Sequence, residues 1–228
     1  MKDDISLKII AKIRTDFPSK FGIPRQSGLV PSLRARIVFE PEYRDVSAVR
    51  GLEGYSHLWL LWKFSESVCD TWQPTVRPPR LGGNKRIGVF ATRSPFRPNP
   101  IGLSSVKLER IIENTPDGCV IEVSGADLMD NTPIYDIKPY IPYTDSHPDA
   151  TGGFSDSVYG NNIAVDFPKE IENELPSEIL TPLKEILAND PRPAYQNDDR
   201  VYSFEFADYK IKFNVQDEIL KVICVEKI

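Results

Sequence analysis

The residues of this chain that could do chemistry stand in short segments rich in proline, glycine, arginine and asparagine. The stretch 90–102, FATRSPFRPNPIG, holds Arg93, Arg97 and Asn99 among three prolines and contains no acid. Proline fixes φ and keeps the preceding residue extended, so this loop is stiff and loses little entropy on binding. Its guanidinium groups could fork onto a carboxylate or a phosphate. A rigid connector whose arginines pair with acids from elsewhere is the alternative.

This stretch lies inside a basic island. Residues 71–108 contain no Asp or Glu, although the whole chain has a net charge of −5. Such a local excess of positive charge is typical of a surface that binds an anion, including nucleic acid. A solvated face without acids would give the same composition. The basic residues of the island are Arg77, Arg80, Lys85, Arg86, Arg93, Arg97 and Lys107.

Two further loops carry polar groups of chemical interest. In SGADLMDNTPIYDIKPY, Asp127, Asp130 and Asp136 could hold a cation, accept ribose hydroxyls or remove a proton. Asp130 followed by Asn131 is also ordinary turn chemistry. In FGIPRQSGLV, Gln26 and the backbone around it could bind an adenine edge or a carboxylate, and a plain loop is again the alternative.

Several common classes of enzyme are excluded by motifs that the sequence lacks. There is no GxGxxG after a strand, no P-loop, no GxSxG and no HExxH, and only His57 and His147 are available for a hydrolase triad. Three cysteines without a CxxC pair argue against a disulfide framework and against zinc. The apolar run 57–64 is too short to span a bilayer, and residues 1–10 lack the layout of a signal peptide, so we expect a cytoplasmic protein.

The elements that must position these loops are mainly strands. Turn signals separate successive strand patterns without a helical period between them, which favours a small closed antiparallel β-barrel. We expect the barrel over residues 1–148, a linker over 149–164, and a small α+β domain over 165–228. This domain should contain two helical segments, the second of which ends at Asn189 and Pro191, then a hairpin and a last strand. The expected strands are 5–13, 33–40, 57–64, 86–92, 102–111, 119–125 and 133–141.

Four segments together closely resemble the TsaA/TrmO-type family of tRNA methyltransferases. They are FGIPRQSGLV, VRGLEGYSHLWLLWKF, TVRPPRLGGNKRIGVFATRSPFRPNPIGLSSVKL and DLMDNTPIYDIKPYIPYTDSHPDA. The resemblance covers roughly residues 9–150, and DPRPAY at 190–195 is similar to the family's C-terminal domain.

The resemblance implies a β-barrel methyltransferase outside the Rossmann class that uses S-adenosyl-L-methionine (SAM). The implied product is N6-methyl-N6-threonylcarbamoyladenosine at position 37 of tRNA, and the implied assembly is a homodimer with the cofactor near the subunit interface. The implied cofactor-binding residues are Pro24, Arg25, Gln26, Ser65, Glu66, Arg93, Leu103, Asp130, Asn131, Thr132, Pro133 and Ile134.

The remaining expectations concern the proton and the RNA. The acceptor nitrogen is a poor nucleophile that a base would help, and we expect Asp130 in this role, with Tyr135 and Asp136 behind it. A non-catalytic β-barrel module that binds an adenine nucleotide or RNA, or a methyltransferase with another small acceptor, are the alternatives. The residues expected on the RNA side are Arg77, Arg80, Lys85, Arg86, Arg97, Asn99, Arg192 and Tyr195.

Overall fold

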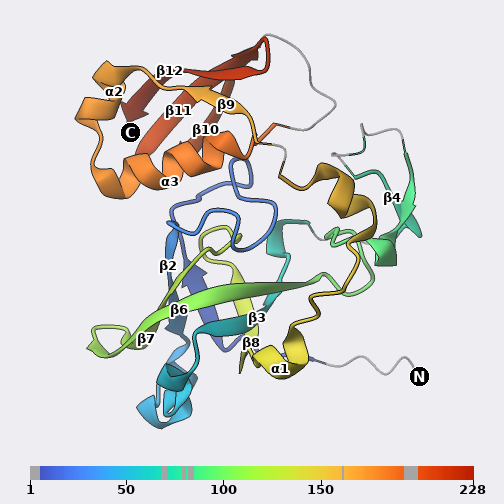
Figure 1. The fold of residues 1–228 in the computed structure, drawn as a ribbon. Coiled ribbons are helices and arrows are strands. Elements are labelled where there is room, and N and C mark those ends of the chain that lie inside the picture. Colours follow the sequence, from blue (N-terminus) through green and yellow to red (C-terminus); the bar gives the residue numbers. More distant parts are fainter. Residues whose placement is uncertain (1–5, 68–70, 79–80, 82–84, 161, 193–199) are drawn as a thin grey trace.

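Six antiparallel strands close into a barrel in the computed structural model, as the sequence predicts (Figure 1). The structure describes residues 6–67, 71–78, 81, 85–160, 162–192 and 200–228. The order around the barrel is β1-β2-β7-β6-β3-β8, and the last strand pairs with the first. These strands are β1 (Ala11–Arg14), β2 (Arg34–Phe39), β3 (His57–Lys63), β6 (Ile101–Thr115), β7 (Gly118–Ser124) and β8 (Pro133–Pro139).

Alternation of side chains along the strands fills the barrel. In β3 the side chains of Leu58, Leu60 and Trp62 point into the core, while the residues between them are half-buried. β3 lies between β6 and β8 and pairs antiparallel with both. This register places Trp62 opposite Gly102, where the absence of a Cβ leaves room for the indole.

Two strand predictions differ from the structure: of the expected strand 5–13, Ala11–Ile13 is extended, as part of β1, and the expected strand 86–92 is wrong. Only Ile87–Gly88 of the expected strand 86–92 is extended, as β5, and Val89–Ala91 forms a 3₁₀ turn. β5 pairs with β4 (Thr75–Val76) in a separate two-stranded sheet. This sheet, together with the residues around β4 and β5, forms an arm that projects from the barrel (Figure 1). The strand ends early because the prolines after residue 94 cannot take part in a regular β ladder. The chain therefore turns before these prolines, and β6 starts after them.

The C-terminal part is a four-stranded sheet packed against helices (Figure 1). Its strand order is β10-β11-β12-β9, formed by β9 (Ala164–Asp166), β10 (Tyr202–Phe206), β11 (Tyr209–Gln216) and β12 (Ile219–Lys227). β9 pairs parallel to β12, and the other pairs are antiparallel. The helices are α2 (Lys169–Glu174) and α3 (Ser177–Ala188), and a short α1 (Pro142–Asp145) follows the barrel. α3 ends before Asn189, as the sequence predicts.

The segment 15–33, which we call the docking loop, joins the two parts. Phe17, Val30 and Leu33 are buried in the hydrophobic core of the C-terminal sheet, not in that of the barrel. The backbone N–H of Ala207 donates to the carbonyl of Asp16 at 2.8 Å. The Ser32 hydroxyl donates to Glu185 of α3 at 2.7 Å. The C-terminal part therefore fixes the loop that contains Pro24, Arg25 and Gln26.

Candidate active site

A cavity of about 520 Å³ opens at the end of the barrel between the docking loop and the residues before β6. Its size falls within the range of small-molecule sites. It is walled on one side by residues 23–26, on another by residues 62–67 at the end of β3, and on a third by residues 92–103. Met129, Thr132 and their neighbours after β7 complete the wall.

Most of the residues expected to bind the cofactor lie on this one cavity. Arg93 crosses the opening and donates through Nη1 to Oε1 of Gln26, which links the two proline-containing loops. Leu103 is exposed on β6, and Ser65 and Glu66 form a short 3₁₀ turn after β3. The expected residues in the cavity wall are Pro24, Arg25, Gln26, Ser65, Glu66, Arg93, Leu103 and Thr132.

The other residues expected to bind the cofactor, which belong to the turn after β7 and the start of β8, face elsewhere. Asp130, Asn131, Pro133 and Ile134 do not line this cavity, and Ile134 is fully buried in the barrel core. Asn131 has φ of 63°, and the backbone N–H of Thr132 donates to the carbonyl of Met129, so residues 129–132 form a tight turn. This turn holds the cavity wall in place, although only part of it faces the cavity.

Asp130, the expected proton acceptor, lies in a second, strongly charged hollow. Its Oδ1 is 3.0 Å from Nε of Arg14 and accepts from the backbone N–H of Thr15 at 3.0 Å. Its Oδ2 accepts from the Asn131 amide at 2.8 Å. Tyr135 and Asp136 are also outside the first cavity, and Asp136 pairs with Lys138 at 2.9 Å. A role for Asp130 in proton transfer would therefore require a contact that this chain alone does not make.

Asp127 is the aspartate that lines the first cavity. Its Oδ1 accepts a hydrogen bond of 2.6 Å from the hydroxyl of Ser104 on β6. Burial raises the pKa of the Asp127 carboxyl, while the Ser104 hydrogen bond and nearby Arg93 act in the opposite direction. From the sequence, Asp127 is one of three acidic candidates, but proton transfer is expected of Asp130, which does not line this cavity. The place of Asp127 between two apolar residues, Ala126 and Leu128, is the sequence signal that could have pointed to it.

The residues expected to contact RNA divide into three groups. Arg97 and Asn99 line the cavity, and Arg97 also donates to the carbonyl of Thr92 at 3.0 Å. Arg77, Lys85 and Arg86 are exposed on the projecting arm. Arg80 and Tyr195 lie outside the described residues.

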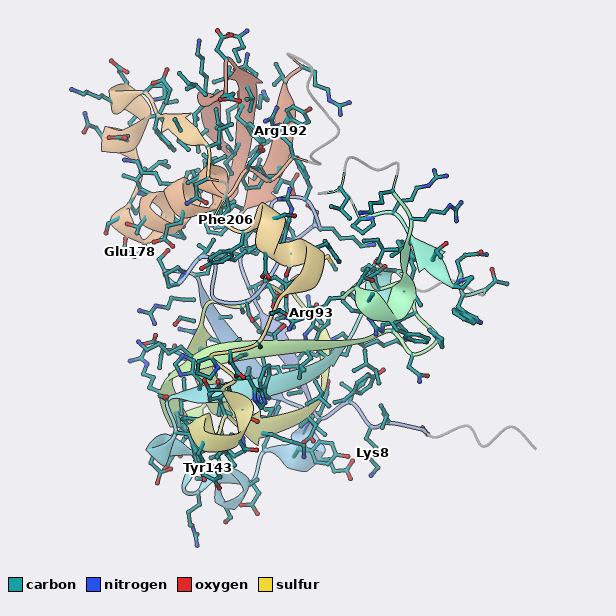
Figure 2. The ribbon with its side chains drawn as sticks, turned by 45° about the vertical axis from the view of Figure 1, so that its right-hand side comes forward. Lys8, Arg93, Tyr143, Glu178, Arg192 and Phe206 are labelled. Atoms are coloured by element: carbon teal, nitrogen blue, oxygen red, sulfur yellow. The ribbon has the colours of Figure 1, made fainter. Side chains whose placement is uncertain are left out.

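Arg192 forms the third group. It lies in the C-terminal part (Figure 2), and it is only 9% exposed. Its Nε and Nη2 donate to the two carboxylate oxygens of Asp190 at 2.9 and 3.0 Å. In addition, Arg25 donates to the carbonyls of Asp190 and Arg192. Asp190 and Arg192 therefore follow the end of α3 and hold the docking loop through Arg25.

Apolar and polar groups thus meet at the mouth of a closed barrel, and the site defines the chain as a β-barrel protein with a small-molecule cavity beside a basic arm. Among the described residues, no cluster of His, Cys, Asp and Glu could hold a metal ion, and no helix is long and apolar enough to cross a membrane.

Comparison with known proteins identifies the family. Residues 12–146 match the N-terminal domain of tRNA-methyltransferase O, and residues 160–228 match the TrmO C-terminal domain. The chain belongs to the tRNA-methyltransferase O family. It is 41% identical over 226 residues to the tRNA (adenine(37)-N6)-methyltransferase of Escherichia coli K12, a match that covers 95% of this chain and 96% of that protein.

Two other relatives agree with this assignment. RcsF of Pseudomonas aeruginosa, whose name describes an S-adenosylmethionine-dependent methyltransferase, is 38% identical over 230 residues, covering 96% of this chain and 97% of RcsF. A crystal structure of TrmO from Pseudomonas aeruginosa superimposes with a TM-score of 0.79 at 34% identity, covering 100% of this chain and 99% of that one.

Proposed function

We propose that the protein transfers a methyl group from SAM to N6 of N6-threonylcarbamoyladenosine at position 37 of tRNA. One observation carries the proposal: the family's loop segments converge on a single cavity at the end of the barrel, beside an arm with exposed basic side chains. The names of the relatives, which match along nearly the whole chain, agree with this reaction.

The lining of the cavity suits the proposed donor. Ile101, Leu103 and Phe64 offer apolar surface for a purine ring, and Arg93 offers a guanidinium for the carboxylate of the amino-acid end. Glu66 supplies negative charge for the cationic amine and sulfur of the donor. When bound, the donor supplies a methyl group on a positively charged sulfur, so the protein needs no nucleophile of its own. Its tasks are to position the two reactants and to exclude water.

The acceptor side of the proposal uses the basic residues. Arg97 and Asn99 stand at the cavity, where the modified base would enter, and Arg77, Lys85 and Arg86 are exposed for the anticodon-loop backbone. Arg80 and Tyr195 are proposed contacts of the same kind. We also propose a homodimer that acts in the cytoplasm. Light scattering of the purified protein tests the dimer, and a monomer at working concentration would contradict it.

The decisive experiment supplies the full-length protein with SAM carrying a deuterated methyl group and with two forms of one tRNA. One form carries threonylcarbamoyladenosine at position 37, and the other has unmodified adenosine there. Mass spectrometry of the nucleosides should find the labelled methyl on threonylcarbamoyladenosine in the first form only. Label on the unmodified adenosine would contradict the proposed acceptor. Binding of SAM by calorimetry without any labelled nucleoside would indicate a binding module instead of an enzyme.

A further inference from the structure

Three side chains form a hydrogen-bonded chain from the barrel core to the cavity. The indole Nε1–H of Trp62 on β3 donates to the Ser104 hydroxyl at 3.0 Å, and that hydroxyl is 2.6 Å from Oδ1 of Asp127. Trp62 and Ser104 are buried, at 8% and 1% exposure, and buried side chains in a protein interior are closely packed. These hydrogen bonds therefore connect the core of the barrel to one carboxylate in the wall of the cavity.

The same hydrogen bonds also fix the direction in which the Ser104 hydroxyl proton points. Indole nitrogen only donates, so Ser104 must use its oxygen as acceptor toward Trp62. The single hydroxyl proton of Ser104 is then directed to Asp127. An ionised carboxylate accepts this hydrogen bond better than a protonated carboxyl group does. The arrangement holds the carboxyl of Asp127 in one orientation and favours its charged form, against the burial that raises its pKa.

We propose that Asp127 takes the proton from the acceptor nitrogen during methyl transfer and that Ser104 positions it. This inference rests on the function proposed above. The sulfur–methyl bond breaks and leaves its electron pair on sulfur. A bond forms between the methyl carbon and N6, and the N6–H proton passes to the Asp127 carboxylate. The positive charge on sulfur and the negative charge on Asp127 disappear in the same reaction, which a partly apolar cavity favours.

The other charged groups on the cavity are mostly cations. None of these can accept a proton while charged, and Glu66 is exposed on its short turn after β3 without a fixed donor like Ser104. Asp127 is thus the carboxylate of the wall that is half-buried and is held in place by a fixed donor. The charged groups that line the cavity besides Asp127 are Lys20, Arg25, Lys63, Glu66, Arg93 and Arg97.

The test compares Asp127→Asn with Asp117→Asn, the same exchange at an exposed position in the turn between β6 and β7. Asn keeps the shape of Asp127 but cannot take the proton. We expect Asp127→Asn to lower the single-turnover rate roughly 10²- to 10⁴-fold. The Kd for SAM, measured by calorimetry without tRNA, and the melting temperature should stay near those of the unmodified protein. Asp117→Asn should change none of these quantities.

The pH profile separates proton transfer from a structural role. The rate of the unmodified protein should rise with pH and level off above the pKa of Asp127, and this rise should be absent in Asp127→Asn. Ser104→Ala removes a hydrogen bond that lowers this pKa, so the levelling should move to higher pH. Asp127→Glu restores a base, and part of the rate should return.

Two results would overturn the inference. One is an Asp127→Asn variant that keeps its rate, and the other is a variant that loses SAM affinity while its rate at saturating SAM is unchanged, which would make Asp127 a donor-binding group. If the unmodified protein methylates no threonylcarbamoyladenosine, the proposed function itself is wrong, a failure that is visible before any variant is measured.

Discussion

At the scale of single residues, the contact between Arg93 and Gln26 is where two loops far apart in sequence meet over the cavity. Arg93 is exposed, so its substitution should leave the fold intact. Loss of a charge-assisted hydrogen bond costs about 1.5–3 kcal/mol, so Arg93→Ala should raise the Kd for SAM roughly 10- to 100-fold. Arg93→Lys keeps the charge but not the paired N–H donors of the guanidinium, so its Kd should fall between those of the unmodified protein and Arg93→Ala. Calorimetry measures both, and Arg50→Ala, exposed and outside the cavity, is the control. Unchanged affinity in Arg93→Ala would remove this residue from the site.

Also at this scale, the sequence predicts the loops better than the direction of single carboxylates. Pro24, Gln26, Arg93 and Leu103 are predicted together, and the cavity brings them together. The stiffness of proline-containing loops is a local property that the sequence carries. Whether Asp127 or Asp130 faces the cavity depends on how the turn after β7 packs against β1, through the bond from Thr15 to Asp130. That packing joins residues 115 positions apart and has no local signal.

At the scale of elements, the pairing of β3 with β6 depends on Gly102. A Cβ at this position would lie 2.2 Å from the Trp62 indole, so Gly102→Ala must displace the ring and disturb its bond to Ser104. We expect a loss of about 1–3 kcal/mol in the free energy of unfolding, as is usual for overpacking. Gly54→Ala is the matched control, because nothing lies within 4 Å of the Cβ it would add. Urea denaturation measures both, and equal stabilities would show that the indole moves aside freely.

One ion pair in the barrel wall also makes a pH-dependent contribution to the stability of the fold. Glu109 of β6 accepts from Ser124 of β7 and pairs with Arg34 of β2 at 2.6 Å, and these contacts lower its pKa from 4.5 to about 2. Because the folded pKa is depressed, this contribution is complete above pH 4.5 and is lost as the pH falls toward 2. Glu109→Gln should therefore destabilise the protein at pH 7 and lose less stability between pH 5 and pH 3. Urea denaturation at these pH values tests it, with exposed Glu53→Gln as control. Parallel pH curves for Glu109→Gln and the unmodified protein would contradict the assignment.

At the scale of the whole molecule, the charge is divided between a basic arm and an otherwise acidic chain. If the arm binds the anticodon-loop backbone, replacing Arg77, Lys85 and Arg86 together by Ala should weaken tRNA binding. The slope of log K against log salt should fall by about 0.7 for each lost phosphate contact. Filter binding over a range of salt concentrations measures the slope. Replacement of Lys8, Lys12 and Arg50, which are outside the island, removes the same charge. An equal effect of both triple variants would show that only net charge matters.

The two parts of the molecule communicate through the docking loop, and Gly22 is its tightest point. Gly22 has φ of 97°, and a Cβ there would lie 2.5 Å from the ring of Phe204 on β10. Gly22→Ala should therefore shift the loop and weaken SAM binding at Pro24–Gln26, although Gly22 itself does not line the cavity. Gly28→Ala is the control in the same loop, because it shares the positive φ, at 80°, but has nothing within 4 Å. Adding Phe204→Leu to Gly22→Ala makes room for the new methyl group and should restore part of the affinity. Calorimetry with SAM measures all four proteins, and equal losses in Gly22→Ala and Gly28→Ala would mean that backbone strain alone, not the contact with the C-terminal sheet, controls the site.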